Sequence, residues 1–349
     1  MTLDTQLNSF SRSVGIVGAG LIGGSIALGL RKAGWRVIGF DLDPDVMSVA
    51  RDRTFFDEVA SDIDALIARA PDLLVIAAPP TATVDLVGSI RTDIPTMDVA
   101  GVKVPVLEVA VHLPRFIGTH PMAGRETSGP TAASAALFKG ATWVVVGGGD
   151  AGAEQLVTSA VADLGARVVN MTARDHDVAV AAISHLPHLV AGALLSGALE
   201  TPVALELAAG SFRDLTRVGA SAPIPWVELL KTNQKPVLAA IEMLRDELAT
   251  LEDAIVAQDD TLLTLLSRSR DTRRSLGAPV AQVRVALADE PGELAKVGHA
   301  FEESGVDIRD IQMRHAPYGG GGVLTLSVRP GDEASLRDAL MAQGLLLVA

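Results

Sequence analysis

Apolar positions in the first half of the chain form short continuous runs, separated by stretches with an apolar residue at roughly every third or fourth position. The runs are typical of buried strands, and the intervening pattern is typical of helices that pack by one face. A last unit of this kind extends from Ala153 to Val169. We therefore expect residues 1–170 to form a mostly parallel α/β sheet with helices on both faces. The expected strands are Ser13–Val17, Arg36–Phe40, Leu73–Ala78, Thr96–Val99, Arg115–Ile117 and Thr142–Val146.

From Thr172 to about Leu266 the strand signals fade, and Ala- and Leu-rich helical patterns dominate. The segment between Val178 and Leu207 has few charges and is apolar on too many sides for an isolated surface helix. We expect an all-α domain over residues 171–270 that buries a face against a second subunit, and a thick monomeric bundle is the alternative. Helix breaks are expected at Pro187, Pro202, Pro223, Pro225 and Pro236.

The arginine-rich segment Ser267–Ser275 is interpreted as solvated chain, and residues 271–280 as the linker to a last domain over 281–349. The pattern of this domain predicts the order βαββαβ. Its expected elements are strands at Gln282–Ala288, Val306–Met313, Val323–Val328 and Leu345–Val348, with helices at Glu293–Glu303 and Glu333–Met341.

Composition narrows the classes of function. The 349 residues include 48% hydrophobic residues and no cysteine, which excludes disulfides and thiolate chemistry and fits a cytoplasmic protein of two or three domains. The apolar runs are too short for a membrane span, and the start of the chain lacks the pattern of a signal peptide. The net charge of −13 disfavours a nucleic-acid partner and requires specific arginines for any anionic ligand.

A GxGxxG motif directly follows the first expected strand and opens the first helix, as in Rossmann dinucleotide-binding domains. The first glycine permits a tight turn, the second lets a pyrophosphate approach the helix N-terminus, and the third allows close helix packing. Asp41, after the second strand, is placed to bind ribose hydroxyls. The carboxylates of Asp43 and Asp45 would repel a 2'-phosphate, so NAD is the expected cofactor. A glycine turn without cofactor is the alternative. The motif comprises Gly18, Ala19, Gly20, Leu21, Ile22 and Gly23.

The stretch Gly118–Glu126 presents His120 directly before a proline, at about the distance where a nucleotide domain reaches its substrate. We interpret His120 as a proton acceptor beside a hydride acceptor. An incidental surface histidine in a turn is the alternative. Further along, His185 and His188 form a His-x-x-His pair. No third ligand is evident, so no metal site is expected.

Three separated motifs, Gly118–Gly129, Ser184–His188 and Phe212–Arg217 followed by Trp226, resemble the prephenate and arogenate dehydrogenases of tyrosine biosynthesis. The resemblance covers nearly the full chain. It implies NAD-dependent oxidative decarboxylation of prephenate to 4-hydroxyphenylpyruvate by a homodimer. The C-terminal unit, with Asp289–Gly292 expected to cap its first helix, resembles an ACT domain, which implies an amino-acid effector such as tyrosine.

The resemblance also implies roles for individual residues. His120 matches the catalytic histidine, and Arg217 matches the arginine that pairs with a substrate carboxylate. His185 is either a core histidine or a contact of the same pocket. Further matching residues around the substrate are His188, Glu126, Asp214 and Trp226.

Two positions depart from the family pattern. Gly101 stands where the family usually carries a serine that orients the catalytic histidine, so a water, Thr119 or another donor must replace it. Ala222 stands where the family often has an acid.

Three alternatives to a prephenate dehydrogenase stay open from the sequence. An arogenate dehydrogenase differs only in the substrate side chain. If the chain were a β-hydroxyacid or imine dehydrogenase, the Arg217 motif and the C-terminal unit would have no explanation. An NAD- and amino-acid-binding sensor without catalysis is favoured only by Gly101.

Overall fold

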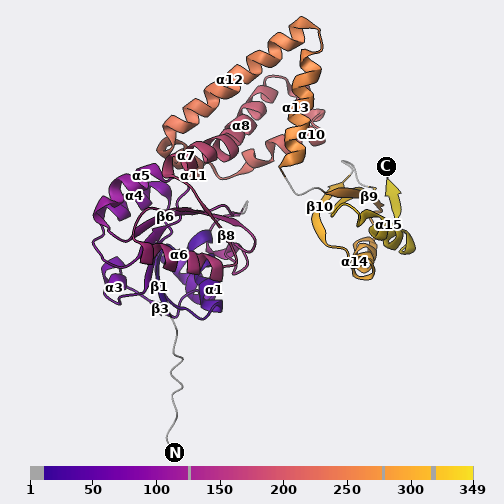
Figure 1. Cartoon of the computed structure of the whole chain (residues 1–349). Coiled ribbons are helices and arrows are strands. Elements are labelled where there is room, and N and C mark those ends of the chain that lie inside the picture. The colour runs from indigo at the N-terminus through magenta and orange to yellow at the C-terminus, as the bar shows by residue number, and fades with distance from the viewer. Residues whose placement is uncertain (1–11, 125–126, 277–279, 316–319, 349) are drawn as a thin grey trace, which may run out of the picture. The chain divides into compact units, whose positions relative to one another are not determined.

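The structure is a computed structural model that describes residues 12–124, 127–276, 280–315 and 320–348 (Figure 1). The side chains of Pro202 and Ala204 are outside this description. Contacts divide the chain into two compact units, Met1–Asp246 and Glu247–Ala349.

The first unit contains an eight-stranded sheet in the order β3-β2-β1-β4-β5-β6-β7-β8. Neighbouring strands are parallel except for β6 and β7, which are antiparallel; within the described residues 122–124 and 127–141, the loop that joins them contains a 3-10 turn and no crossover helix. The expected mostly parallel sheet is confirmed, and β3 is an addition to it. The strands are β1 Ser13–Val17, β2 Arg36–Phe40, β3 Glu58–Val59, β4 Leu73–Ile76, β5 Thr96–Asp98, β6 Phe116–Pro121, β7 Thr142–Val146 and β8 Arg167–Asn170.

Helices cover both faces of this sheet, with a separate core on each face. Successive residues of β4 alternate between them: Leu73 and Val75 belong to one core, and Leu74 and Ile76 to the other. This alternation explains why β4 reads as a continuous apolar run. The doubly wound arrangement is confirmed. The helices are α1 Leu21–Lys32, α2 Pro44–Asp52, α3 Ile63–Ile67, α4 Pro80–Ser89, α5 Val104–Val109 and α6 Ala151–Asp163.

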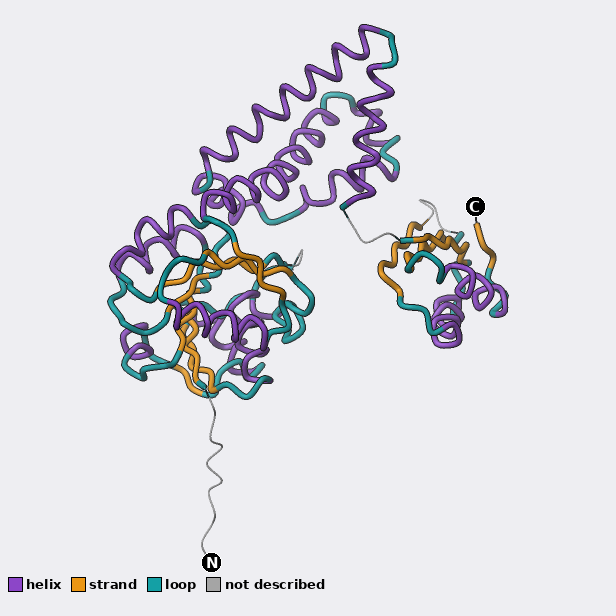
Figure 2. Tube along the Cα trace, viewed as in Figure 1, coloured by secondary structure: helices purple, strands orange, loops and turns teal. Residues whose placement is uncertain are grey.

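The chain then becomes helical, as Figure 2 shows. Pro187 was expected to break a helix, but α7, the π-helical turn η3 and α8 form one continuous run, because Pro187 lies in the first turn of α8 directly after η3. Pro236 likewise lies near the start of α12. The elements are α7 Ala173–Val180, η3 Ala181–His185, α8 Leu186–Leu199, α9 Pro202–Glu206, α10 Gly210–Thr216, the 3-10 turn η4 Arg217–Ala220, α11 Pro223–Thr232 and α12 Gln234–Ala257.

Within the described residues, the run Ala173–Leu199 is the one helix whose length and composition alone would allow it to cross a membrane. Three polar side chains along it, His176, Asp177 and His185, are buried within the protein. The first half of this helical run therefore packs against other parts of the protein through these three side chains.

The second unit begins within α12 and continues with α13, Thr261–Ser275. The segment Ser267–Ser275 is solvated as expected, but it is not a linker, because its arginines lie along this exposed helix. Expected linker residues 277–279 lie outside the described residues.

The small C-terminal sheet has the order β10-β11-β9-β12 with antiparallel neighbours, and the expected βαββαβ order is confirmed. Apolar residues of its strands pack with Val297 and Leu336 of its two helices. The stretch Asp289–Gly292 caps the first helix as expected: Gly292 is the N-cap, with φ +99°, and no side-chain hydrogen bond contributes. The elements are β9 Ala281–Leu287, α14 Glu293–Ser304, β10 Ile308–His315, β11 Gly322–Val328, α15 Glu333–Ala342 and β12 Leu346–Val348.

Candidate active site

His120 lies near the end of β6 and is half-buried. Its Nδ1 is 2.8 Å from Nε2 of His176 on α7. Its other ring nitrogen faces Gly101, where a Cβ, if the residue carried one, would lie 3.7 Å from Nε2 of His120 and 3.1 Å from a methyl carbon of Leu229. One ring nitrogen is therefore held by the protein, and the other faces the position where the family serine would stand.

His176 and Asp177 hold this arrangement from the first turns of α7. Nδ1 of His176 is 2.8 Å from Oδ1 of Asp177, and both residues are buried. The carboxylate of Asp177 also accepts hydrogen bonds from the backbone N–H groups of Lys103, at 2.7 Å, and Val104, at 2.8 Å. These groups start α5, so the carboxylate fixes α7 to the sheet domain.

A buried ion pair between Lys103 and Asp98 lies next to the strand that carries His120. Nζ of Lys103 pairs with Asp98 at the end of β5 and also donates to the carbonyl oxygen of Thr119, at 2.6 Å. Burial raises the pKa of Asp98 and lowers that of Lys103, so hydrogen bonds must sustain the two charges. The pair therefore ties the ends of β5 and β6 together beside the site.

A second group of predicted residues meets on the helical side. The rings of His188 and Trp226 are stacked, with centroids 3.7 Å apart, and His185 meets the same indole edge-on. Nδ1 of His185 lies 3.2 Å from Nδ2 of Asn233, which also donates to the carbonyl oxygen of Asp177. The two clusters are thus connected through Asn233. His185, left open between core and pocket, is buried and belongs to this connection.

The remaining residues predicted to lie around the substrate are Arg217, Asp214 and Glu126. Arg217 begins η4 and is exposed, as is Asp214 on α10. The turn η4 packs on α8 near Ala191 and Leu195, beyond His188. Glu126 lies outside the described residues.

Thr119 corrects an expectation. Its hydroxyl is fully buried and donates to the carbonyl oxygen of Asp98, at 2.5 Å. Because side chains alternate along a strand, Thr119 and His120 lie on opposite faces of β6. Thr119 therefore joins β5 to β6 and does not replace the missing serine at Gly101.

The glycine motif has the shape that a dinucleotide requires. A Cβ at Gly18 would lie 2.3 Å from the carbonyl oxygen of Ala77, and one at Gly23 would lie 1.9 Å from that of Gly18. A Cβ at Gly20 would meet nothing within 4 Å. Gly18 is therefore required by the close approach of the backbone after β4 and by its φ of +99°, and Gly23 by the close approach of α1 to Gly18. Gly20 borders open space at an uncapped helix N-terminus.

A cavity of about 960 Å³ extends from this turn and is lined by Gly18, Gly20, Asp41 and Asp43. The carboxylate of Asp41 accepts from the backbone N–H of Ala19, at 2.7 Å, and of Asp43, at 2.9 Å. These contacts fix Asp41 at the end of β2. Ala19, Leu21 and Ile22 contribute the backbone of the turn and of the first turn of α1.

Burial keeps the histidines neutral. Burial lowers the pKa of His120 well below its usual value of 6.5, and the neighbouring Lys103 lowers it further. Burial also lowers the pKa of His185 to about 4 and lowers that of His188. A neutral His120 carries a lone pair that can accept a proton. In the described part of the chain, no three histidine or carboxylate side chains are grouped to hold a metal ion.

Comparisons with known proteins place this arrangement in a family. The model for the nucleotide-binding domain of prephenate dehydrogenase matches residues 26–170, and that for its dimerization domain matches residues 172–268. The cyclohexadienyl dehydrogenase of Zymomonas mobilis is 32% identical over 76% of this chain and 96% of its own length. The chain belongs to the prephenate dehydrogenase family.

Other relatives agree with this assignment. The prephenate dehydrogenase of Bacillus subtilis is 28% identical and covers 94% of this chain and 95% of its own length. The structure of prephenate dehydrogenase from Aquifex aeolicus with hydroxyphenyl propionate and NAD⁺ is 29% identical. It covers 76% of this chain and 98% of that one, with a TM-score of 0.70. Synechocystis arogenate dehydrogenase matches with a TM-score of 0.66, at 29% identity, over 76% of this chain and all of that one.

The glycines of this family member give a matched pair of substitutions. Gly20→Ala should change the free energy of unfolding by less than about 1 kcal/mol, because its Cβ enters open space, yet weaken NAD binding by obstructing the pyrophosphate. Gly23→Ala should destabilise the protein by about 1–3 kcal/mol through overpacking. Urea unfolding and calorimetric NAD titration of both variants measure these effects. Unchanged NAD affinity in Gly20→Ala would contradict the cofactor site.

The neutral histidines predict a loss of stability in mild acid. The unfolded chain takes up protons below pH 6.5, whereas His120 and His185 resist protonation in the folded state. The free energy of unfolding should therefore fall as pH drops from 6.5 toward 4, by up to about 1.4 kcal/mol per pH unit for each histidine. Urea unfolding at several pH values measures the slope. His185→Gln should reduce the slope, and a slope equal to that of the wild-type protein would refute the assignment.

Proposed function

We propose that this chain is an NAD-dependent prephenate dehydrogenase that converts prephenate to 4-hydroxyphenylpyruvate. The observation that carries the proposal is the half-buried His120, with one ring nitrogen bound to His176 and the other directed toward the space at Gly101. Family membership and the glycine-motif cavity support it. The proposal includes a cytoplasmic location, where NAD and the substrate are soluble metabolites.

The residues of the site supply proton transfer and alignment. NAD, when bound, accepts the hydride from ring carbon C4. His120 accepts the proton of the C4 hydroxyl at Nε2. The ring carboxylate leaves as carbon dioxide, its bonding electrons make the ring aromatic, and the resulting phenolate oxygen takes a proton back to give the phenol of the product. Asp41 and Asp43 favour NAD over NADP, because both carboxylates line the cavity and would repel a 2'-phosphate. Release of carbon dioxide makes the reaction effectively irreversible.

Arg217 is proposed to bind a carboxylate of the substrate, because its planar guanidinium offers two parallel donors. The stacked rings of His188 and Trp226 form a flat surface in the same helical region as Arg217. Asp214 and Glu126 belong to this proposal as neighbours of the substrate. Prephenate is the first choice, and arogenate is the rival, since Synechocystis arogenate dehydrogenase has a similar fold.

We further propose a homodimer through the helical region. Many large apolar side chains of this region are exposed in the single chain, which is unusual for a monomer. Leu194 is 39% exposed and Leu199 is 66% exposed, both on α8. The matched dimerization-domain model covers this region. Others of the exposed set are Val178, Ile183, Val203, Leu205, Leu207 and Leu215.

The C-terminal unit is proposed to be an ACT-like module that binds an amino acid such as tyrosine. Its four-stranded antiparallel sheet with two helices supports this role. The Bacillus subtilis relative covers 94% of this chain, so it shares at least part of the unit. The effector would act on the same reaction.

The decisive assay follows NADH formation with prephenate or arogenate, with and without tyrosine. Prephenate should be the better substrate, and tyrosine should change the rate. His120→Asn should lower kcat by about 10²–10⁴-fold while NAD binding is kept, because the proton acceptor is lost. Arg217→Ala should raise KM far more than it lowers kcat.

The outcomes separate the proposals. Full turnover of His120→Asn with normal NAD binding would refute the role of His120. No turnover of either substrate by a protein that binds NAD would favour a sensor without catalysis. A rate that no amino acid alters would remove only the regulatory proposal.

The dimer is tested by the molar mass in solution. Light scattering on a sizing column should give twice the 36.2 kDa of one chain. The double variant Leu194→Glu/Leu199→Glu should shift the mass toward one chain, since it places charges in an apolar interface. Val111→Glu, at an equally apolar but isolated surface position, is the matched control. A monomeric wild-type protein would contradict the proposal.

A further inference from the structure

Three side chains from two distant segments form a linear series beside the site. Oδ1 of Asp177 lies 2.8 Å from Nδ1 of His176, and Nε2 of His176 lies 2.8 Å from Nδ1 of His120. The first two residues are buried, with 2% exposure for Asp177 and none for His176. The proposed reaction uses only the last member, so the other two require an explanation.

The series fixes where protons lie. Both carboxylate oxygens of Asp177 accept backbone N–H groups, and Oδ1 also accepts from the ring of His176. Nδ1 of His176 therefore carries a proton. In a neutral His176, Nε2 then has a lone pair and must accept from Nδ1 of His120. The second nitrogen of His120, Nε2, is left with a lone pair directed toward Gly101.

We propose that His176 and Asp177 are positioning residues that hold the proton of His120 on Nδ1 and keep Nε2 as the acceptor for the substrate hydroxyl. This role rests on the proposed function. It also explains how His120 is oriented in this chain. Gly101 stands in place of the family serine, and the buried hydroxyl of Thr119 is already bonded to the carbonyl oxygen of Asp98. The ring of His120 is oriented by His176, which contacts Nδ1, and not by a residue at position 101, which faces Nε2.

Other groups around His120 do not compete for this role. The titratable or charged side chains that face it are His176 from α7, His185 from η3 and Lys103 before α5. The ammonium of Lys103 is paired with Asp98 and bound to the carbonyl oxygen of Thr119. Nδ1 of His185 is directed to Asn233. Only His176 contacts Nδ1 of His120 among the described hydrogen bonds.

The alternative proton arrangement makes a different prediction. If His176 were doubly protonated, it would donate to Nδ1 of His120, and the single proton of neutral His120 would move to Nε2. Such a ring would donate toward the substrate and could not accept the hydroxyl proton. The two arrangements differ by the position of one proton, which is measurable.

In the proposed arrangement the series also assists proton uptake. When Nε2 of His120 accepts the hydroxyl proton, the ring becomes an imidazolium, and its Nδ1–H bond to His176 becomes charge-assisted. His176 is polarised in turn by the carboxylate of Asp177. The positive charge is therefore stabilised in a buried place where solvation is weak, without any further bond being broken.

The direct test is nitrogen NMR of the full-length protein labelled with ¹⁵N-histidine, without substrate, at pH 7. His120 should show a protonated, pyrrole-type Nδ1 and an unprotonated, pyridine-type Nε2. His120→Asn and His176→Gln assign the signals. A proton on Nε2 of His120, or a doubly protonated His176, would overturn the proposal. This result does not depend on turnover, so it is distinguishable from a failure of the proposed function.

Kinetics test the consequence. His176→Phe keeps a buried ring but removes the acceptor, and it should lower kcat about 10²-fold with little change in KM. The acid limb of its kcat–pH profile should lie at lower pH, because the imidazolium of His120 loses its stabilising partner. His176→Gln, whose side-chain oxygen can accept from Nδ1 of His120, should recover much of kcat.

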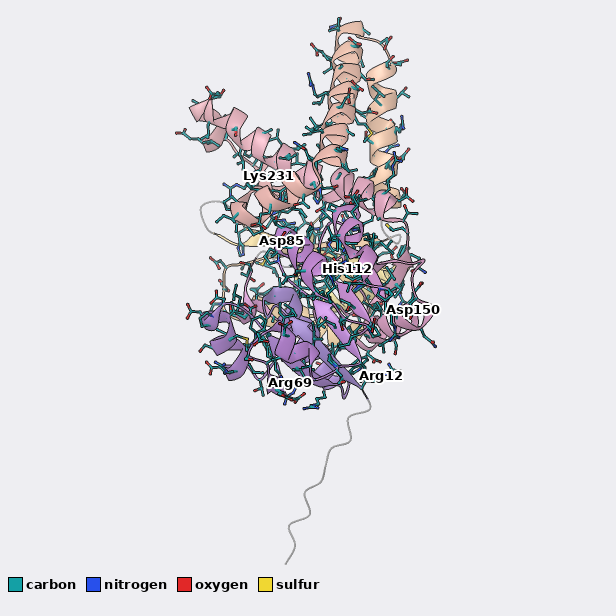
Figure 3. All side chains as sticks on the ribbon, turned by 90° about the vertical axis from the view of Figure 1, so that its left-hand side faces the viewer. Arg12, Arg69, Asp85, His112, Asp150 and Lys231 are labelled. Atoms are coloured by element: carbon teal, nitrogen blue, oxygen red, sulfur yellow. The ribbon has the colours of Figure 1, made fainter. Side chains whose placement is uncertain are left out.

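The control is His112→Gln, which replaces a half-buried histidine of the same domain whose ring is bonded to Arg91 and Ile90; His112 is labelled in Figure 3, and the variant should keep the wild-type kcat. Thermal melting of each variant checks that it is folded. A folded His176→Phe protein with wild-type kcat and an unchanged acid limb would overturn the positioning role. Equal losses of kcat in folded His176→Phe and His176→Gln would also overturn it, because a purely structural role would not distinguish an acceptor from a ring.

Discussion

The carboxylate of Asp177 is the contact on which the site depends most. It receives the backbone N–H groups of Lys103 and Val104 at the start of α5 and the ring of His176. Its own carbonyl oxygen accepts from Asn233 at the junction of α11 and α12. A buried carboxylate is costly unless its hydrogen bonds are satisfied, so these partners must keep their places together. Asp177 thereby fixes the helical region against the sheet near the end of β6, where His120 lies.

The π-helical turn η3 complements this anchor. His176 and His185 are nine positions apart, which would place them on opposite sides of an uninterrupted α-helix with about 3.6 residues per turn. The wider turn at Ala181–His185 absorbs an extra residue and rotates His185 toward the side of His176. As a result both histidines are buried near Asn233, and His188 continues to Trp226. The cluster around His120 and the cluster around Trp226 are thus joined by one irregular turn.

Sequence patterns predicted the parts of the fold that depend on local signals. The glycine motif, the strand runs and the C-terminal βαββαβ order were recognisable because each follows from residues close together in the chain. His120 was proposed as a site residue for the same reason, because it lies in a short stretch of unusual composition. The helix through Pro187 was missed because a proline usually ends a helix, and only the π turn makes room for it. The helical Ser267–Ser275 was missed because exposed helices carry little apolar pattern.

The supporting residues of the site could not be found in this way. His176 and His120 are 56 positions apart, and a His-Asp pair in a first helical turn reads as a solvated cap. Its one signal is that this polar pair opens an otherwise apolar run. The commitment of Thr119 to the carbonyl of Asp98 likewise depends on the pairing of two strands. Long-range packing, which no local pattern encodes, decided these roles.

The central claim is that Nε2 of His120 meets the reacting hydroxyl while Nδ1 is held by His176. A crystal structure of the protein with NAD⁺ and hydroxyphenyl propionate, the pair bound in the Aquifex aeolicus relative, measures both contacts. The account predicts the phenol oxygen within about 2.6–3.2 Å of Nε2 of His120, with the bond from Nδ1 to His176 intact. A phenol oxygen bound by another side chain, or a His120 ring turned away from His176, would contradict it.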